Sequence, residues 1–327
     1  MKGHLNKMDK ILIIDGSYLM YKSYFAFKNR HLKIELDGEE IITSAIFGFI
    51  RELVNIKTKL NHSFIICAWD GPPYLKANKY DYYKNKPRNK IPNLAQEKEI
   101  IQAFLFSLNI PCLISSGYEG EEVARSVIKK LKKKFKIDFY TNDEDCFVLI
   151  SKNVNFLNSK EDNITKSRKF LSFNKKDLLL KYCVTPKQFR WFKALTGCSS
   201  DNIPGVKGIG KKYASSLINK YNNIEEILNN IEEIKKEQPK IAEKIILSKE
   251  NKSLEESIYL TKIKAPKKLS LMIPEETDLT YKDILEFINA KTLLTKDNSL
   301  YYLAIKKSQT KKLKLMERRI GWKMIKN

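Results

Sequence analysis

Several apolar runs in this sequence end in an aspartate or lead into an acidic turn. Parallel strands bring their carboxyl ends to one edge of a sheet, where open α/β sheets bind ligands, so we expect these aspartates to lie together. Carboxylates gathered there would repel one another unless cations lay between them, and such hard oxygen ligands suit Mg²⁺ or Mn²⁺. The aspartates are Asp15, Asp70, Asp143 and Asp145.

Strand-like runs alternate with helix-like stretches from Lys10 to about Leu157. The strand-like runs are mostly apolar, as in strands that are buried on both faces. This alternation predicts an α/β fold with a parallel sheet covered on both faces by helices. The expected strands are Ile11–Asp15, Phe64–Trp69, Ile110–Ile114, Ile137–Tyr140 and Val154–Leu157, and the expected helices lie near Ser44–Leu60, Leu94–Leu108 and Glu119–Lys134.

The second half of the chain has a different pattern. The polar and charged stretch from Asn158 to Lys169 indicates a surface loop, and from Lys175 onward strand signals nearly vanish. Helical patterns then dominate, with a glycine cluster between two of them. The expected domains are residues 8–182, which are α/β, and residues 183–327, which are helical and end in a basic tail.

The chain is strongly basic. Lys and Arg number 61 against 38 Asp and Glu in 327 residues, which gives a formal net charge of +23 at pH 7. Such an excess favours a polyanionic partner, because contacts with phosphates release counterions from the nucleic acid. Charge that serves only solubility is the alternative. No apolar run approaches the length of a transmembrane helix, so we expect no membrane association.

The cysteines and histidines argue against a disulfide-bonded protein and against a zinc protein. The five cysteines show no paired spacing and indicate a reducing compartment, and the three histidines show no metal-type spacing, so zinc is not expected. The start of the chain lacks an apolar signal core. We expect an intracellular protein of the cytoplasm or nucleoid, or of an organelle if a presequence has been removed.

One stretch does not fit the alternation of strands and helices. Residues 71–92 follow Asp70 directly and are dense in Lys, Arg and Tyr but poor in aliphatic residues, so they cannot pack as a core element. Cations that meet phosphates and rings that meet bases are what a surface for single-stranded nucleic acid needs. A solvated basic loop is the alternative, and the position beside Asp70 favours the functional interpretation.

Several motifs occur in a fixed order along the chain. They are Ile-Asp15-Gly-Ser-Tyr-Leu, Ile-Phe-Gly48-Phe, Trp-Asp70, Tyr83-Lys84, Gly-Tyr-Glu119-Gly-Glu121-Glu122-Val, Thr141-Asn-Asp143-Glu-Asp145 and the long segment from Ala194 to Gly210. In these motifs the chain resembles the 5′ nuclease family, which includes phage flap endonucleases and the amino-terminal 5′→3′ exonuclease domain of bacterial DNA polymerase I. The resemblance implies a PIN-like (resolvase-like) parallel-sheet nuclease domain and a helical helix-three-turn-helix domain. No polymerase sequence follows, so we expect a stand-alone member.

The resemblance also implies divalent cations, Mg²⁺ or Mn²⁺, two per active site. One cation would be held mainly by Asp15, Asp70, Glu119 and Glu121, with Glu122 and Asp143 near it, and the other by Asp145, Asp201 and the position of Cys198.

Some of these positions depart from the family pattern. The family has aspartates where Glu121 and Glu122 stand, and glutamate keeps the charge on a longer side chain. Acidic residues in a first helical turn are also ordinary partners of the helix dipole. The family has a further aspartate where Cys198 stands. A thiol is a soft ligand that matches Mg²⁺ poorly, so we expect the second metal site to be weak, shared with water, or formed only when the DNA phosphate is present.

The basic residues receive roles by the same resemblance. Lys84 would polarise the scissile phosphate with the help of Arg88, and Tyr83 would stack on a base near the cut. The segment that carries them would form an arch through which a 5′ end is threaded. Lys22 and Lys76 stand where family members have arginines, and a lysine keeps the charge but not the bidentate geometry toward phosphate.

Residues 198–221 resemble a helix-hairpin-helix that grips the backbone of a duplex, with K⁺ held by main-chain carbonyls. Glycines let backbone amides approach a phosphate beside a helix N-terminus. A nucleotide-binding P-loop is a poor alternative, since a lysine replaces the Ser or Thr that would hold Mg²⁺ and a helix precedes the loop. The expected nucleic-acid contacts are Gly205, Lys207, Gly208, Gly210, Lys211 and Lys212.

These features predict a structure-selective 5′→3′ exonuclease and flap endonuclease that hydrolyses DNA phosphodiesters in replication and repair. Its substrates would be 5′ flaps, nicked or gapped duplexes and RNA primers, and we expect a monomer. A DNA-junction-binding protein that has lost most catalysis is the alternative, motivated by Cys198 and the two glutamates. A related ribonuclease of the same α/β class is disfavoured by the helix-hairpin-helix.

Overall fold

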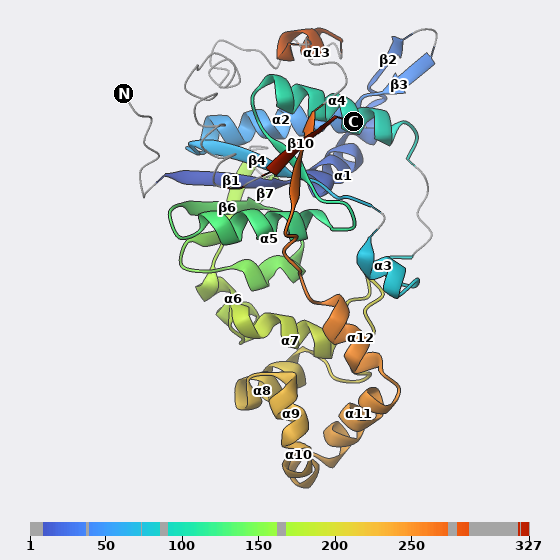
Figure 1. Cartoon of the computed structure of the whole chain (residues 1–327), viewed down its shortest axis with the longest axis vertical. Helices are drawn as coiled ribbons and strands as arrows, with labels where there is room; N and C mark the ends of the chain where they lie inside the picture. The colour runs from blue at the N-terminus through green and yellow to red at the C-terminus, as the bar shows by residue number, and fades with distance from the viewer. Residues whose placement is uncertain are drawn as a thin grey trace.

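An eight-stranded sheet carries helices on both faces in this computed structural model, and a helical region extends from one side (Figure 1). The strand order is β10-β9-β5-β4-β1-β6-β7-β8, and the five strands from β5 to β7 are parallel. The predicted α/β fold with a parallel sheet is therefore confirmed. The structure describes residues 9–36, 39–72, 74–85, 91–161, 168–273, 280–287, 320 and 322–326.

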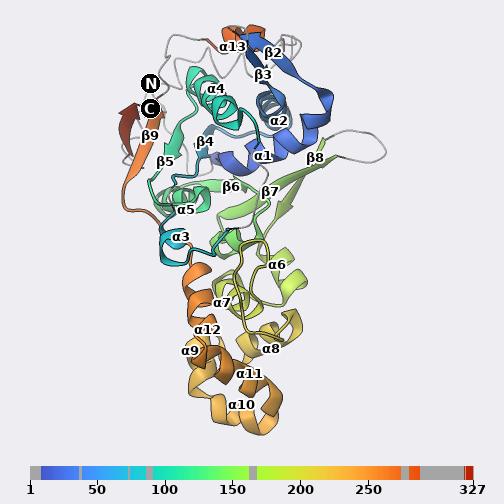
Figure 2. The ribbon, with the colours of Figure 1, turned by 90° about the vertical axis from the view of Figure 1, so that its right-hand side faces the viewer.

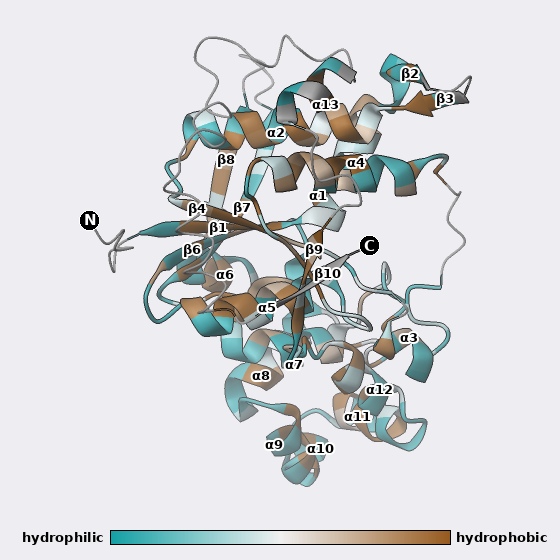
Figure 3. Cartoon of the chain, turned by 45° about the horizontal axis from the view of Figure 1, so that its top comes forward, coloured by the Kyte–Doolittle hydropathy of each residue, from teal (hydrophilic) through white to brown (hydrophobic). Residues whose placement is uncertain are grey.

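The central strand of the sheet is buried on both faces. Ile11 and Ile13 pack into the core on one face of the sheet, whereas Leu12 and Ile14 pack into the core on the other. The central strands are accordingly among the most hydrophobic segments of the chain, drawn brown in Figure 3. The main sheet comprises β1 (Lys10–Asp15), β4 (Phe64–Ala68), β5 (Cys112–Ile114), β6 (Lys136–Tyr140), β7 (Val154–Glu161), β8 (Arg168–Phe173), β9 (Leu269–Ile273) and β10 (Trp322–Lys326), and β2 (Lys33–Leu36) and β3 (Glu39–Ile42) form a separate hairpin.

Helices cover the two faces of the sheet unequally. One face is covered by α1, α2 and α4, and the other by α5, α6 and α7, as Figure 2 shows. Residues of η2 also pack on the second face. The helical region continues from the second face. The helices are α1 (Gly16–Phe27), η1 (Lys28–Arg30), α2 (Ser44–Lys59), α3 (Leu75–Lys79), α4 (Leu94–Ser107), α5 (Gly120–Leu131), η2 (Glu144–Leu149), α6 (Lys175–Tyr182), α7 (Pro186–Thr196), α8 (Lys211–Tyr221), α9 (Ile224–Asn229), α10 (Ile231–Glu237), α11 (Pro239–Glu250), α12 (Ser253–Leu260) and α13 (Tyr281–Phe287).

Helix α1 was not predicted from the sequence, although it directly follows the first aspartate. The Asp15 side chain caps it by accepting from the backbone N–H of Tyr18 at 3.0 Å. Its position is fixed by a close crossing with α2, where a Cβ added to Gly48 would lie 2.7 Å from the Cβ of Ser23. Tertiary packing, rather than the propensity of this segment of Gly, Ser and aromatic residues, therefore decides that it is helical.

The predicted surface loop from Asn158 to Lys169 is wrong at both ends. Asn158–Glu161 belong to β7, and Arg168 and Lys169 begin β8, which pairs antiparallel with β7. An edge strand with one face in water tolerates polar residues, so the sequence lacked the apolar signal on which the prediction relied.

The predicted helical region after residue 183 also contains two strands that the sequence did not indicate. Strand β9 pairs antiparallel with β5 at the edge of the main sheet, and β10 pairs in parallel with β9. The chain thus returns to the α/β core after its helical excursion. Of the predicted basic tail, residues 306–327, residues 322–326 form β10, and residues 306–319, 321 and 327 lie outside the described residues. The domain boundary near residue 182 stays a prediction. In the described part of the chain, no helix is long and apolar enough to cross a membrane.

We predict that Gly48→Ala lowers the melting temperature. Alanine is favoured over glycine inside a helix by about 1 kcal/mol, but the new methyl would lie 2.7 Å from the Cβ of Ser23 and 2.8 Å from the ring of Phe27. Overpacking of this kind costs about 1–3 kcal/mol. Thermal unfolding measures the effect, with Gly210→Ala as the control because a Cβ there meets nothing within 4 Å. A Gly48→Ala protein more stable than wild type would contradict this account of the crossing.

Candidate active site and metal centre

A cavity of about 950 Å³ opens at the carboxyl edge of the central strands. Asp15 ends β1, Asp70 follows β4 and Asp143 follows β6, and all three line this cavity. Glu121, in the first turn of α5, joins them there. The ammonium-bearing side chain of Lys84 lines the same cavity. The structure therefore brings together four predicted metal ligands and the predicted catalytic lysine.

Neutral donors hold the carboxylates of Asp70 and Asp15 in place. Asp70 accepts from the backbone N–H of Gly120 at 2.7 Å and from the Tyr74 hydroxyl at 3.1 Å. Asp15 accepts from the Thr141 hydroxyl at 3.0 Å. A side chain at position 120 would crowd both carboxylates, because a Cβ there would lie 3.2 Å from Asp70 Oδ1 and 3.5 Å from Asp15 Oδ1. The glycine at the start of α5 thus lets the carboxylates approach one another closely.

Burial and mutual repulsion oppose the ionisation of all the carboxyl groups in the cavity. Burial, and then the neighbouring Asp70, raise the pKa of Asp15 from 3.8 to about 7. Burial and then Asp145 raise the pKa of Asp143 to about 6, and burial and then Glu119 raise the pKa of Glu121. Without a cation, the stabilising contribution of protonated Asp15 is fully present below pH 3.8 and is lost as the pH rises through about 7. A bound divalent cation would remove this repulsion.

Two of the predicted metal ligands face lysines instead of the cavity. Glu119 forms an ion pair with Lys76 at 2.8 Å and another with Lys84. Burial alone would raise the pKa of Glu119, but Lys84 and then Lys76 outweigh it and hold that pKa below its usual range. Glu122 accepts from the backbone N–H of Lys264 at 2.9 Å. Neither glutamate lines this cavity or the smaller one beside it, and their metal-binding role stays a prediction.

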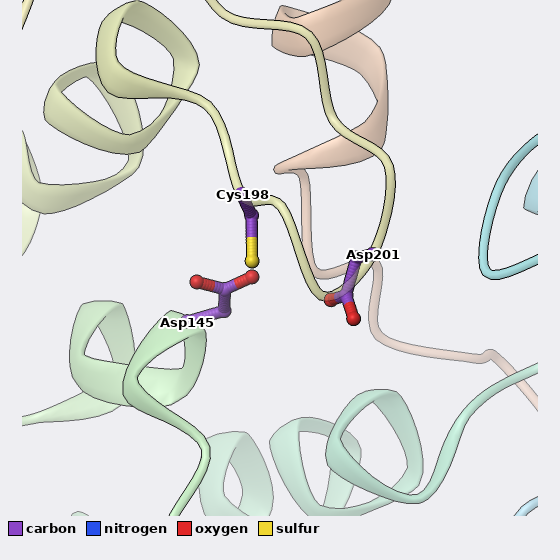
Figure 4. A group of neighbouring side chains, drawn as sticks. All are labelled: Asp145, Cys198 and Asp201. Carbon is purple, nitrogen blue, oxygen red and sulfur yellow. The ribbon is translucent and has the colours of Figure 1, made fainter. Parts of the chain in front are cut away.

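A second acidic group lies beside the first, in a cavity of about 380 Å³ that shares Asp143 with it. Asp145 comes from η2, and Cys198 and Asp201 come from the loop between α7 and α8 (Figure 4). Their potential ligand atoms all lie within 4.8 Å of one another. Lys193 reaches in from α7, and its ammonium lies 2.7 Å from a carboxylate oxygen of Asp145. The structure therefore assembles the second predicted group, with a thiol among its donors.

Other predicted nucleic-acid residues point inward. Lys22 donates to the Tyr140 hydroxyl at 2.8 Å and to the Ser159 hydroxyl at 3.0 Å, and burial lowers its pKa to about 8. The buried ring of Tyr83 places its hydroxyl 3.1 Å from both carboxylate oxygens of Glu119. Lys76 is buried as well. These contacts give all three residues structural partners, so their DNA roles stay predictions. Arg88 lies outside the described residues.

The glycine hairpin lies between α7 and α8, as the sequence predicted. Gly205 and Gly208 have φ angles of +65° and +80°, in the left-handed region that side chains rarely adopt. The carbonyl of Gly208 accepts from Lys244 at 3.1 Å. Gly210 precedes α8 directly, and among the described residues no side chain caps the first backbone N–H groups of that helix. The basic side chains Lys207, Lys211 and Lys212 are all exposed.

Sequence reasoning missed one wall of the larger cavity. Tyr21, Phe25 and Lys28 on α1 and η1 line it, and Tyr21 and Phe25 are 38% and 57% exposed. The ammonium of Lys28 lies 5.2 Å from the centre of the Phe25 ring. The spacing of four residues between the two aromatic side chains, on a segment that begins at an aspartate, was the available signal. Tyr74, Thr141 and Lys193 were missed because their roles depend only on tertiary contacts.

Comparisons with known proteins agree with this geometry. The family model described as "5'-3' exonuclease, N-terminal resolvase-like domain" matches residues 10–180, and the model described as "5'-3' exonuclease, C-terminal SAM fold" matches residues 184–283. The chain belongs to the 5′-3′ exonuclease family. It is a nuclease, and the use of divalent metal ions is a property of that family. The predicted family membership is confirmed.

Individual proteins are similar over most of their length. The chain is 32% identical to a 5′-3′ exonuclease of Aquifex aeolicus over 71% of this chain and 77% of that protein. It is 33% identical to a 5′-3′ exonuclease of Buchnera aphidicola over 85% of this chain and 92% of that protein. The chain also shares its fold with the T5 D15 protein, whose crystal structure was obtained with metal ions. The match covers 94% of this chain and 99% of the T5 chain, with a TM-score of 0.58 and 16% sequence identity.

We predict that Mg²⁺ or Mn²⁺ raises the melting temperature and that Asp70→Asn abolishes the rise. A ligand that binds only the folded state stabilises it by about 2.7 kcal/mol at 100 times its dissociation constant. Thermal unfolding at pH 8, with and without metal, measures the effect. The control is Asp138→Asn, because buried Asp138 lies within β6, pairs with His62 and Lys10 and lines neither cavity. An undiminished rise in Asp70→Asn would place the metal elsewhere.

Proposed function

We propose that this chain is a structure-selective 5′ nuclease that hydrolyses DNA phosphodiesters at 5′ ends and flaps, with Mg²⁺ or Mn²⁺ in the larger cavity. One observation carries the proposal. The carboxylates of Asp15, Asp70, Glu121 and Asp143 share a single cavity with the ammonium-bearing side chain of Lys84. This donor set consists of oxygen atoms only, which fits Mg²⁺ and Mn²⁺.

The chain's own residues supply positioning and positive charge for the reaction. When bound, divalent cations activate an attacking water and stabilise the leaving oxygen in phosphodiester hydrolysis. Burial favours the neutral form of Lys84, but Glu119 and then Glu121 outweigh it and hold the pKa of Lys84 above its usual range. Lys84 therefore stays charged at neutral pH. Its ammonium can then offset the negative charge that develops on the phosphate oxygens.

The polypeptide that carries Lys84 is attached to the helical region. The backbone N–H of Lys84 donates to the carbonyl of Asp201 at 3.1 Å, and the Asn202 side chain donates to the carbonyl of Tyr82 at 2.8 Å. Both Asp201 and Asn202 lie in the loop that leads to the glycine hairpin. Binding of a duplex at the hairpin would thus act on the segment of the catalytic lysine through these two hydrogen bonds.

The helices after residue 183 supply the grip on the duplex in this proposal, and residues 8–182 supply the nuclease centre. Backbone N–H groups at the N-terminus of α8, together with exposed Lys207, Lys211 and Lys212, would contact phosphates. Main-chain carbonyls of the hairpin would hold K⁺. Gripping of the backbone explains how an enzyme can select flaps, nicks and gaps without reading bases, and RNA primers paired to DNA fall within the same substrate class.

We predict that Lys84→Ala and Asp70→Ala each lower metal-supported cleavage of a 5′ flap while flap binding is retained. Removing a single group that stabilises charge in a transition state costs about 10²–10³ in kcat. Cleavage of an end-labelled flap substrate under single-turnover conditions gives the rate, and gel-shift titration in Ca²⁺ gives the affinity.

Lys132→Ala is the matched control, since Lys132 is an exposed lysine at the C-terminus of α5, remote in sequence from the cavity residues. It should cleave at the wild-type rate. If wild-type protein binds the flap but cleaves it with neither Mg²⁺ nor Mn²⁺, the nuclease assignment fails and a junction-binding protein replaces it.

A further inference from the structure

The group formed by Asp145, Cys198 and Asp201 is chemically unlike the larger cavity. It offers one sulfur and two carboxylates, and each can direct a ligand atom to a common point because all such atoms lie within 4.8 Å of one another. Figure 4 shows the Cys198 sulfur and the Asp145 carboxylate directed toward one another, with Asp201 on the same side. The three side chains line an open cavity of about 380 Å³, so a dissolved ion can reach them.

The backbone around Cys198 is fixed independently of its side chain. The N–H and the carbonyl of Cys198 bond to the carbonyl and the N–H of Ile203, at 3.0 Å and 2.9 Å. The sulfur lies 3.0 Å from the Ser200 hydroxyl. A substitution at Cys198 should therefore change the donor atom without unfolding the loop.

A cation already lies at this place. The Lys193 ammonium lies 2.7 Å from a carboxylate oxygen of Asp145. The side chain of Lys193 stands in for the positive charge that the group requires.

The donor set does not fit Mg²⁺. This ion demands oxygen ligands in a near-octahedral arrangement and is reluctant to lose its water. Thiolate ligands instead favour softer ions of the Zn²⁺, Co²⁺ and Cd²⁺ type, and Zn²⁺ in particular combines sulfur with carboxylate ligands in tetrahedral sites. The larger cavity, whose predicted ligands are all carboxylates, has the opposite preference.

We propose that Asp145, Cys198 and Asp201 form a binding site for a thiophilic divalent cation, selective for Zn²⁺-type ions over Mg²⁺. The nuclease thus has two chemically distinct metal positions, a hard inner one and a soft outer one. On binding, the Cys198 thiol loses its proton to solvent and the thiolate sulfur donates an electron pair to the cation, while Lys193 is released from Asp145. The proposal rests on the proposed function only for the role of the inner position.

The first test is the optical titration of the full chain with Co²⁺ and with Cd²⁺, in a Cys183→Ser background that removes the exposed competing thiol. A bond from thiolate to metal produces a charge-transfer absorption in the ultraviolet, which carboxylates alone do not give. We expect this absorption to saturate at one equivalent and to persist in a large excess of Mg²⁺. Asp70→Asn, in the inner cavity, should leave it unchanged.

Cys198→Ser is the decisive variant, because a hydroxyl does not ionise under these conditions. Loss of an outer-shell partner already weakens metal sites by about 10–100-fold, so the loss of a ligand sulfur should weaken Cd²⁺ binding at least as much and abolish the absorption. Asp201→Asn should weaken binding but keep the absorption. A charge-transfer band that survives Cys198→Ser, or that Mg²⁺ displaces at an equal concentration, would overturn the proposal.

Cys198→Asp tests the same position from the other direction. It gives the site an all-carboxylate donor set, so Mg²⁺ should now compete with Cd²⁺, and flap cleavage supported by Mg²⁺ should rise above that of the parent. A rate that is unchanged or lower would show that Cys198 does not limit the use of Mg²⁺ at this site. Failure of all variants to cleave DNA, with the absorption intact, would refute the proposed function and leave the soft site standing.

Discussion

Mutual repulsion among buried carboxylates at the carboxyl edge of the sheet is the interaction on which the rest of this structure depends. Asp15, Asp70 and Asp143 are delivered to one place by three parallel strands, and Glu121 is added by a helix. At low dielectric such groups cannot all ionise without a cation, which is why the pKa values of Asp15 and Asp143 are raised to about 7 and about 6. The fold therefore gathers carboxylates whose mutual repulsion bound divalent metal ions would relieve.

The need to neutralise buried carboxylates also explains the lysines around the site. Lys84 and Lys76 neutralise Glu119, and Lys193 neutralises Asp145. Lys76 and Lys84 come from the segment after β4 and Lys193 comes from α7, so the acidic centre draws these segments toward the start of α5. A substrate phosphate and a metal ion would compete for the same partners. Redistribution of these ion pairs is a direct physical route by which binding could rearrange the segment that carries Lys84.

Features that depend on local sequence patterns could be predicted without the structure. Apolar runs of residues such as Ile11–Ile14 predicted strands that are buried on both faces, and the order of strands and helices predicted the parallel sheet. Polar edge strand β8 and the late strands β9 and β10 were not predictable in this way, because their pairing depends on neighbours far away in the chain. Helix α1 was missed for a related reason, since its packing against α2 outweighs weak local propensity.

In the candidate site, too, some features follow from local sequence and others from tertiary packing. By itself the sequence determined which chemistry is present: the carboxylates at strand ends, the basic segment after Asp70, the glycine hairpin and the thiol of Cys198, because residue type and spacing along one element carry that information. Only the tertiary structure decided which groups face one another. It turned Glu119 and Glu122 toward lysines and peptide N–H groups, buried Tyr83, and placed Cys198 within reach of Asp145. Those outcomes depend on the packing of elements that are distant in sequence, and local sequence patterns do not indicate how such elements pack.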